Sequence, residues 1–391
     1  MNTKISKKNV NLTFFFLLLT IVQVIMNRSI AVADNTLESL CSYIVMLLGF
    51  GIFFGSYFFI PEINFKDFFL FLFLLYLFWI YMENSGREQL IAVLEFSLML
   101  TVWRSSKIIM LSENAYKVLL FVEIIQGIIF ILLSFSGVAY KPYVEYTSVS
   151  EELTLGFPNP NQTGIILFSV IVILSLLVRS IYSEKRLRFL VYIEIIYLFV
   201  LLIRTDARTS ILSCVVFMIF YFFNIANVLK RRHPVIVAIL SIVSLPFVFI
   251  YNLLSEKYSQ ENIMIFGKKL FSGRQRVYHN VLENWSNRAF GNLSDFCFQN
   301  SHNASLTILA NIGIVGFIMY AIYIIAELLE LYQSCYRKAA FYPFLAILCL
   351  FIMGCAETAV LTSGTVYFVN LLILVTICRN YAQKYTEGNE R

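Results

Sequence analysis

The chain has 391 residues, of which 59% are hydrophobic, 16% aromatic and only 14% charged, and its formal net charge is +6. A soluble domain is about one-quarter charged, so this composition excludes a water-soluble globular protein and indicates an integral membrane protein. The mean hydropathy of +0.76 supports the same class.

Apolar segments long enough to cross a bilayer, at roughly 20 residues per crossing, recur along the whole chain. They predict about twelve helices, near 10–26, 39–60, 67–82, 89–103, 117–138, 163–178, 187–203, 209–229, 235–254, 304–326, 341–357 and 361–378. The period-two alternation of a membrane barrel is absent. We therefore expect an all-α, polytopic fold that forms one integral membrane domain over residues 1–391, with a long extracytoplasmic loop, 255–303, between helices 9 and 10.

The distribution of Lys and Arg predicts the orientation. With the N-terminus inside, 19 of the 30 basic residues fall on the inner side, and six of the other 11 lie in the loop 255–303. Because basic residues concentrate on the cytoplasmic side, both termini are predicted to be cytoplasmic. The first segment also resembles a signal peptide ending at Ala31-Val32-Ala33, but a first transmembrane helix is the preferred interpretation.

The seven cysteines include no CxxC pair and no Cys/His cluster. Neither a disulfide framework nor a zinc site is therefore indicated, and no metal or other cofactor is expected.

The outer connection from Ala139 to Gln162 ends in Gly156-Phe157-Pro158-Asn159-Pro160-Asn161. Two prolines and two asparagines predict a rigid turn, with Asn161 near the start of the next helix. The turn serves either as a simple helix cap or as the wall of a binding site.

A second outer connection contains Arg204-Thr205-Asp206-Ala207-Arg208-Thr209. Residues four apart face the same way on a helix, so Arg204 and Arg208 are expected on one face. Asp206 could neutralise either of them locally. Alternatively, the two guanidinium groups are suited to gripping a diphosphate.

The loop 255–303 contains an amphipathic helix near 273–289, with Ser272 as N-cap and Gln275 completing a capping box. A helical wheel places Arg274 on the apolar face with Tyr278, Val281, Leu282, Trp285 and Ala289, and places Arg276, His279, Glu283 and Asn287 on the polar face. Such a helix is expected to lie against the outer membrane surface.

These two faces separate the candidate residues of the helix. His279 is expected to form a solvated pair with Glu283, four residues on. Arg274 needs an anionic partner on its apolar face, which makes it a better ligand contact than Arg276.

Ser301-His302-Asn303 lies where this loop enters an apolar segment. Ionisable groups are disfavoured there, so His302 is a candidate for chemistry at the membrane surface. With an unperturbed pKa near neutrality it could accept a proton from a sugar hydroxyl or hydrogen-bond it. Gly313 and Gly316 are expected to allow close helix packing behind it.

Four acids, Glu95, Glu123, Glu194 and Glu357, lie in or near apolar segments, where each is unfavourable unless paired or protonated. Glu357, near the outer end of its helix, could face the same site as His302. For the other three, polar pairing inside the bundle is favoured over the proton pathway of a transporter.

Several of these motifs, taken in order, resemble the O-antigen ligase/Wzy polymerase superfamily of bacterial membrane glycosyltransferases. The resemblance covers roughly residues 150–320: the Asn-Pro-Asn turn, the segment 204–209, Ser272-Gly273-Arg274, and His302-Asn303 followed by Gly313 and Gly316. The Arg-Thr-Gly form typical of the family is interrupted here by Asp206-Ala207, which leaves open whether Arg204 or Arg208 corresponds to it.

The resemblance implies a GT-C-like helical fold and a metal-independent polymerase in the bacterial plasma membrane. Such an enzyme joins undecaprenyl-diphosphate-linked oligosaccharide units into O-antigen, capsular or exopolysaccharide. His302 and Arg274 would be catalytic, and Arg204, Arg208, Arg276, Asn161 and Asn303 would bind substrate. The implied partners are the lipid-linked donor and acceptor, membrane lipid, and candidate flippase and chain-length regulator proteins, with no nucleic acid.

Two alternatives remain from the sequence. A ligase would transfer the glycan to another acceptor, and acceptor choice depends on loop shape. A flippase for lipid-linked sugars would favour inverted repeats, broken helices and short outer loops, and internal repeats are not visible in the chain.

Overall fold

The computed structural model describes residues 2–83, 86–140, 143–145, 148–150, 152–180, 185–223, 244–258, 264–265, 268–269, 273–285, 287–291, 301–335, 341–358 and 364–388. The helices are α1 (Asn2–Ala31), α2 (Asn35–Phe59), α3 (Phe65–Glu83), α4 (Arg87–Ser105), α5 (Glu113–Ser134), α6 (Pro160–Ser180), α7 (Lys185–Arg204), α8 (Arg208–Phe222), α10 (Ser244–Tyr258), α11 (Arg274–Glu283), α13 (Ala304–Cys335), α14 (Phe341–Met353) and α16 (Thr365–Gly388).

The structure confirms a helical, multi-pass architecture. Within the described residues, seven helices are long and apolar enough to cross a membrane: α1, α2, α3, α5, α6, α13 and α16. α8 and α14 are apolar but have only 15 and 13 residues, and α4 and α7 carry charged residues along their length. Parts of the predicted segments 209–229 and 235–254 lie outside the described residues, and the count of about twelve spans stays a prediction.

The predicted all-α fold class is confirmed, and the only strands in the described residues are very short. Two antiparallel hairpins, β1 (Tyr143–Glu145) with β2 (Ser148–Ser150) and β3 (Met264–Ile265) with β4 (Lys268–Lys269), lie in the two long outer connections. Their strands are two or three residues long, too short for the alternation of side chains to be visible in the sequence.

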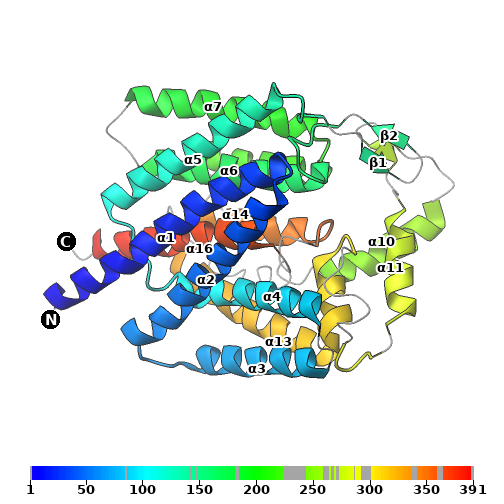
Figure 1. The fold of residues 1–391 in the computed structure, drawn as a ribbon, viewed down its shortest axis with the longest axis horizontal. Helices are drawn as coiled ribbons and strands as arrows, with labels where there is room; N and C mark the ends of the chain where they lie inside the picture. The colour runs from blue at the N-terminus through cyan, green and yellow to red at the C-terminus, as the bar shows by residue number, and fades with distance from the viewer. Residues whose placement is uncertain are drawn as a thin grey trace.

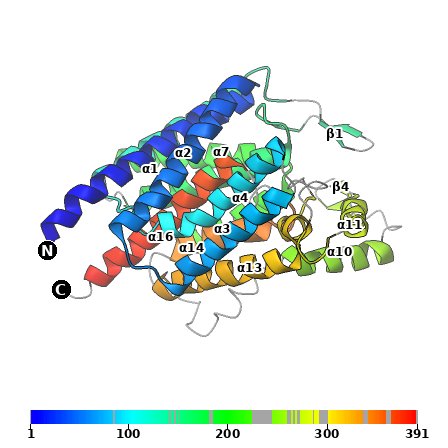
Figure 2. The ribbon, with the colours of Figure 1, turned by 60° about the horizontal axis from the view of Figure 1, so that its bottom comes forward.

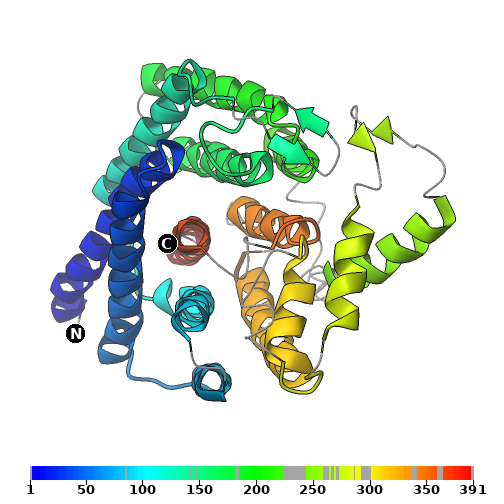
Figure 3. The same cartoon turned by 45° about the vertical axis from the view of Figure 1, so that its right-hand side comes forward.

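Burial distinguishes central from peripheral helices. The membrane-spanning parts of α6 and α16 are almost entirely buried, whereas those of α2, α3 and α5 are only 33%, 28% and 39% buried. The exposed side chains include Leu47 and Phe54 on α2, Phe68 and Phe78 on α3, and Phe121 and Leu132 on α5. Figure 3 shows α16 (red) between the N-terminal helices and the yellow and orange helices. Apolar side chains facing outward are what a lipid environment accepts.

The two ends of the helical bundle hold different parts of the chain. Both termini lie at one end, and α10 and α11 lie at the other, outside the main bundle (Figures 1 and 2). α11 packs against α10 and the start of α13 through a small apolar cluster that includes Tyr278, Val281, Val248 and Leu306.

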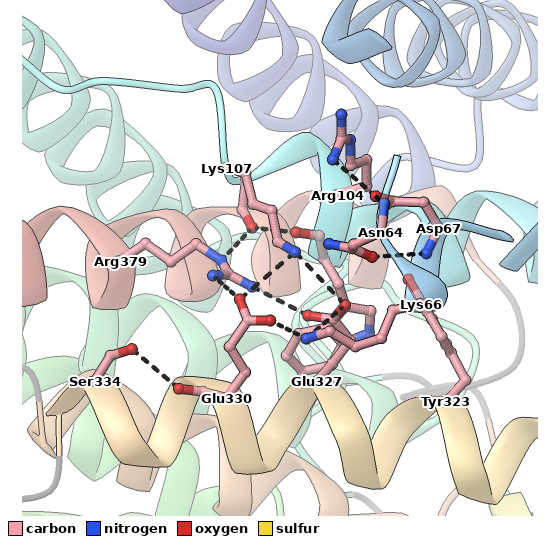
Figure 4. Close-up of polar contacts among 12 residues, drawn as sticks. Asn64, Lys66, Asp67, Arg104, Lys107, Tyr323, Glu327, Glu330, Ser334 and Arg379 are labelled. Atoms are coloured by element: carbon pink, nitrogen blue, oxygen red, sulfur yellow. Dashed lines mark hydrogen bonds and ion pairs between the residues drawn. The ribbon is translucent and has the colours of Figure 1, made fainter. Parts of the chain in front are cut away.

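At the end of the bundle that holds the termini, charged side chains form what we call the terminal ionic cluster: Lys66, Lys107, Glu327, Glu330 and Arg379 (Figure 4). Arg379 of α16 donates to Glu330 Oε1 at 2.9 Å and Glu327 Oε2 at 3.2 Å. Lys66 and Lys107 of the opposite helices contact the same two carboxylates. The cluster therefore ties α3, the end of α4, α13 and α16 together.

A second buried pair lies beside this cluster, where Arg104 Nη1 is 3.0 Å from Asp67 Oδ2. The sequence assigned Lys66, Arg104, Lys107 and Arg379 to the inner face. Their convergence at one end of the bundle agrees with the predicted alternation of helix directions.

Candidate functional site

At the end of the bundle opposite the termini, one residue from each of three distant segments meets. Arg274, the first residue of α11, lies with Nη2 3.5 Å from Oε1 of Glu357, in the turn that follows α14. The Glu357 carboxylate also accepts a hydrogen bond from the side chain of Asn161 in the first turn of α6. We call Arg274, Glu357 and Asn161, together with His302, the outer polar site.

Glu357 is buried, and its surroundings act on its charge in opposite directions. Burial raises its pKa to about 7, whereas the Arg274 guanidinium and the Asn161 hydrogen bond act to lower it. A carboxyl group with a pKa near neutrality can both accept and return a proton under physiological conditions.

His302 precedes α13 in a left-handed conformation, with φ 56°. Its backbone oxygen accepts a hydrogen bond from Tyr278 of α11 at 3.3 Å. Burial, followed by the nearby Arg274 charge, lowers the pKa of His302 to about 4. The expectation of an unperturbed pKa is therefore wrong, because the apolar face of α11 and the Arg274 guanidinium both disfavour an imidazolium there.

Asn303 has a different place from the one expected. It is fully buried, and its Oδ1 caps α13 by accepting the Leu306 N–H at 2.9 Å. Its amide donates to the backbone oxygens of Ser244 at 2.7 Å and Cys355 at 3.3 Å. Both ends of the side chain are thus engaged in holding α10, α13 and the turn after α14 together, and its contact with substrate stays a prediction.

The turn before α6 is built as the sequence indicated. Asn159 caps the helix, since its Oδ1 accepts the Asn161 N–H at 2.8 Å and its backbone oxygen accepts the Thr163 N–H at 3.2 Å. Pro160 occupies the first helical position, where a missing N–H has no consequence. The turn therefore both caps α6 and leaves the Asn161 side chain to contact Glu357.

The predicted buried and exposed faces of α11 are confirmed for the residues that lie within the helix. Tyr278 and Val281 are buried, while Arg276 and His279 are exposed. His279 Nε2 lies 2.9 Å from Glu283 Oε1 in a solvated pair. Arg276 therefore points away from Arg274 and contacts none of the outer polar site.

Two details of α11 differ from the prediction. The helix ends at Glu283, short of residue 289. Its N-cap is Gly273, with φ 85° and no side-chain capping bond, so the capping box of Ser272 and Gln275 is wrong; Ser272 itself lies outside the described residues. A glycine adopts this left-handed conformation without strain, and it aims the first residue, Arg274, back toward the bundle.

Arg204 and Arg208 are not on one helical face. Arg204 ends α7 and Arg208 begins α8, with Asp206 between them at φ 52°. Arg204 is exposed, donates to the Tyr140 hydroxyl and has its guanidinium 5.4 Å from the centre of that ring. The prediction that these two residues, four apart, share one helical face is wrong because the chain reverses direction between them.

The start of α8 nevertheless lies near the outer polar site. A Cβ at Gly164 of α6 would overlap Ala207 and lie 3.2 Å from Ser210 Cβ. The first turns of α6 and α8 are therefore in contact, and the first turn of α6 carries Asn161. Arg208 is half-buried at this junction.

Gly313 does more than permit close helix packing. It breaks the helical conformation inside α13, with φ 66° and ψ −176°. The segment 288–291 crosses the break: Ile314 N donates to Arg288 O at 3.0 Å and Val315 N to Ala289 O at 3.1 Å. A Cβ at Gly313 would overlap Ala289 O, so the glycine fastens the end of the outer loop to α13.

Tyr278 is a site residue that the sequence analysis did not single out. It was assigned only to the apolar face of α11, yet its hydroxyl reaches the His302 backbone. A tyrosine on an apolar face is the relevant signal, because a buried hydroxyl usually has a hydrogen-bond partner.

No group of three or more His, Cys, Asp or Glu residues that could hold a metal ion occurs within the described ranges. The outer polar site consists of one cation, one acid, one amide and one imidazole. Such a set can bind an anion and move a proton.

No protein-family model matches the chain, and neither a curated protein nor a solved structure is significantly similar to it. The family resemblance thus depends on the motifs alone.

Proposed function

We propose that this chain is a membrane glycosyltransferase that polymerises oligosaccharide units linked to a polyprenyl diphosphate, at the outer face of a bacterial plasma membrane. The observation that carries the proposal is the meeting of Arg274, Glu357, Asn161 and His302 at the end of an apolar bundle opposite its termini. A lipid-linked donor would lie with its tail in the bilayer and its diphosphate at this level.

In the proposed reaction, a hydroxyl oxygen of the acceptor sugar forms a bond to the anomeric carbon of the donor. The bond from that carbon to the diphosphate oxygen breaks, and the diphosphate leaves with the electron pair. Arg274 would stabilise the growing negative charge through its guanidinium fork. In leaving Glu357 for the diphosphate, Arg274 would also free the carboxylate.

The acceptor proton needs a base, and the pKa values distinguish two candidates. His302, with a pKa lowered to about 4, is a weak base but stays neutral and can hydrogen-bond the acceptor hydroxyl. Glu357, with a pKa raised to about 7, is the better proton acceptor. We therefore assign the proton to Glu357 and the orientation of the acceptor to His302.

The other arginines predicted to bind substrate have different positions relative to the outer polar site. Arg208, at the α6–α8 junction, would bind the far phosphate or the sugar chain, and Arg204, which lies against Tyr140, would contact the substrate there. Arg276 faces away from the outer polar site and serves as a control. Twelve spans, a GT-C-like fold and cytoplasmic termini are parts of the same proposal, as are flippase and chain-length regulator partners.

The test is complementation of a chromosomal deletion with Arg274→Ala or His302→Ala, with polymer length read on a gel. Both variants are expected to lose long chains while single lipid-linked units still reach the outer leaflet. Arg276→Ala, on the exposed face of the same helix, is the matched control and is expected to keep full-length polymer.

Protein abundance in the membrane must be equal for all variants. Single units trapped on the inner leaflet would show a flippase instead, and loss of transfer to a final acceptor with normal polymer length would show a ligase. Full-length polymer from both site variants would reject the outer polar site.

A further inference from the structure

Two glutamates meet between α5 and α7, about halfway along the two helices. Glu123 lies near the centre of α5 and Glu194 near the centre of α7, two helices that pack together. Their side chains are buried, at 1% and 9% exposed. In apolar surroundings an ionised carboxylate is strongly disfavoured without a partner, so this pair needs an explanation.

The backbone is shaped to receive the Glu194 carboxylate. Gly127 lies on the same face of α5 as Glu123, one turn on, and a Cβ there would overlap Glu194 Oε1 and lie 3.0 Å from its Cδ. Glycine inside a helix costs about 1 kcal/mol relative to alanine. Because Gly127 has no side chain, the Glu194 carboxylate can lie directly against α5. The Cβ of any other residue would occupy that space.

Several polar atoms at this place have no hydrogen-bond partner in the part of the chain that the structure describes. They are Glu123 Oε2, Glu194 Oε1 and both amide atoms of Gln126. Gln126 is 1% exposed and lies three residues from Glu123, on the same face of α5. Buried polar atoms are normally paired, so unpaired oxygens from two helices indicate a ligand with positive charge.

In the part of the chain that the structure describes, the basic residues of the neighbouring helices lie at the helix ends and not at the level of this pair. Lys4, Lys7, Lys8 and Arg28 lie at the two ends of α1, and Arg179 lies at the end of α6, stacked on Tyr342. The basic residues of α7 are at its two ends, and Arg208 begins α8. None of these residues is placed to neutralise a carboxylate in the middle of α5 or α7.

We propose that Glu123, Gln126 and Glu194 form a site for one exchangeable monovalent cation, a proton or a sodium ion. One carboxyl group stays protonated, because two carboxylates this close do not both ionise in apolar surroundings. The other exchanges its proton for the cation, held by carboxylate and amide oxygens, which suit a hard ion. Divalent ions need more oxygen ligands than these three side chains offer.

The test uses the purified full-length protein in detergent and an apolar carbodiimide. This reagent adds to a protonated carboxyl group in apolar surroundings: the carboxyl proton moves to a reagent nitrogen, and the whole reagent mass is retained. Labelling is measured by peptide mass spectrometry at several pH values, in sodium or in choline at equal ionic strength. We expect labelling on Glu123 or Glu194.

If the site takes sodium, a concentration about ten times the dissociation constant should slow labelling about tenfold. If it takes only protons, raising the pH slows labelling and sodium does not. Either result supports the site and identifies the cation. Labelling unaffected by pH and sodium would mean a permanently protonated structural pair and would overturn the proposal.

We call the slowing of carbodiimide labelling by the cation protection. The variants Glu123→Gln and Glu194→Gln should each abolish this protection of the remaining glutamate. Glu95→Gln is the matched control, because the half-buried Glu95 carboxylate already accepts the Gly364 N–H at 3.0 Å. Gly127→Ala should displace Glu194 and weaken protection, while Gly51→Ala, whose Cβ would meet nothing within 4 Å, should not. Protection that survives all three site variants would likewise reject the assignment. The inference does not depend on glycosyl transfer.

Discussion

The two ends of the bundle each hold an arginine against glutamate, but the two arginines are held differently. Arg379 in the terminal ionic cluster uses both terminal nitrogens on carboxylates at 2.9 and 3.2 Å and its Nε on Ser106 at 3.1 Å. Arg274 in the outer polar site reaches Glu357 with one nitrogen at 3.5 Å, the limit of a hydrogen bond.

If the proposed function is right, this difference separates an arginine that stabilises the fold from one that binds substrate. Arg379 makes three hydrogen bonds with good geometry, so moving it would take an arginine away from two glutamates of α13 and leave them only Lys66 and Lys107. Arg274, the first residue of α11, has one contact with Glu357 at 3.5 Å, and in the proposed function an incoming diphosphate would replace Glu357 as its partner with little loss. An arginine–glutamate contact alone thus says little about function; the number and length of its hydrogen bonds say more.

The largest effect is expected for Glu357→Gln, which removes the proposed proton acceptor. Glycosyl transfer should fall by about 10²–10⁴-fold. In the wild type the carboxylate acts when ionised, so the rate should decline as pH falls below about 7, the raised pKa of this group. The measurement is the pH–rate profile with purified lipid-linked substrate, and a glutamine variant that keeps the acidic decline would exclude Glu357 as the base.

Next in size is Glu327→Gln at the opposite end. Because it leaves Arg379 and two lysines with too little negative charge in a buried place, stability should fall by about 3–5 kcal/mol. Thermal unfolding in detergent measures this loss. Transfer per folded molecule should be unchanged, and a selective loss of activity at normal stability would remove the distinction between the two ends.

Arg274→Lys sharpens the comparison, since it keeps the charge and loses the planar fork. A point charge cannot grip a diphosphate in two places, so the rate should drop by about 10²–10³-fold. Arg379→Lys is the counterpart, with an expected effect on unfolding temperature and none on rate. Equal rates for Arg274→Lys and wild type would show that charge alone is used.

The smallest effect is expected for Asn303→Ala, which removes the cap of α13. Loss of a cap costs about 1–2 kcal/mol, and the two bonds to Ser244 and Cys355 are lost with it. The unfolding temperature should fall while the KM for the lipid-linked donor stays the same. A large rise in KM would return Asn303 to the substrate contacts.

The local features of the outer site were predictable from the sequence because they depend on neighbours in the chain. The turn before α6 follows from its prolines and asparagines, and the buried and exposed faces of α11 follow from helical periodicity. Helical periodicity gave a wrong prediction for Arg204 and Arg208, because the chain reverses at Asp206 between them. The pKa of His302 was also missed, because it depends on burial that no local pattern records.

The sequence by itself determined the membrane class, the helical architecture and the residue types at the outer end, because apolar length and charge distribution are properties of the chain. Only the tertiary structure decided which of those residues meet. Arg274, Asn161 and Glu357 are far apart in sequence and come together through the packing of α6, α11 and α14. Glu123 and Glu194 meet for the same reason, because which faces of α5 and α7 touch is set by the whole bundle and not by either helix alone.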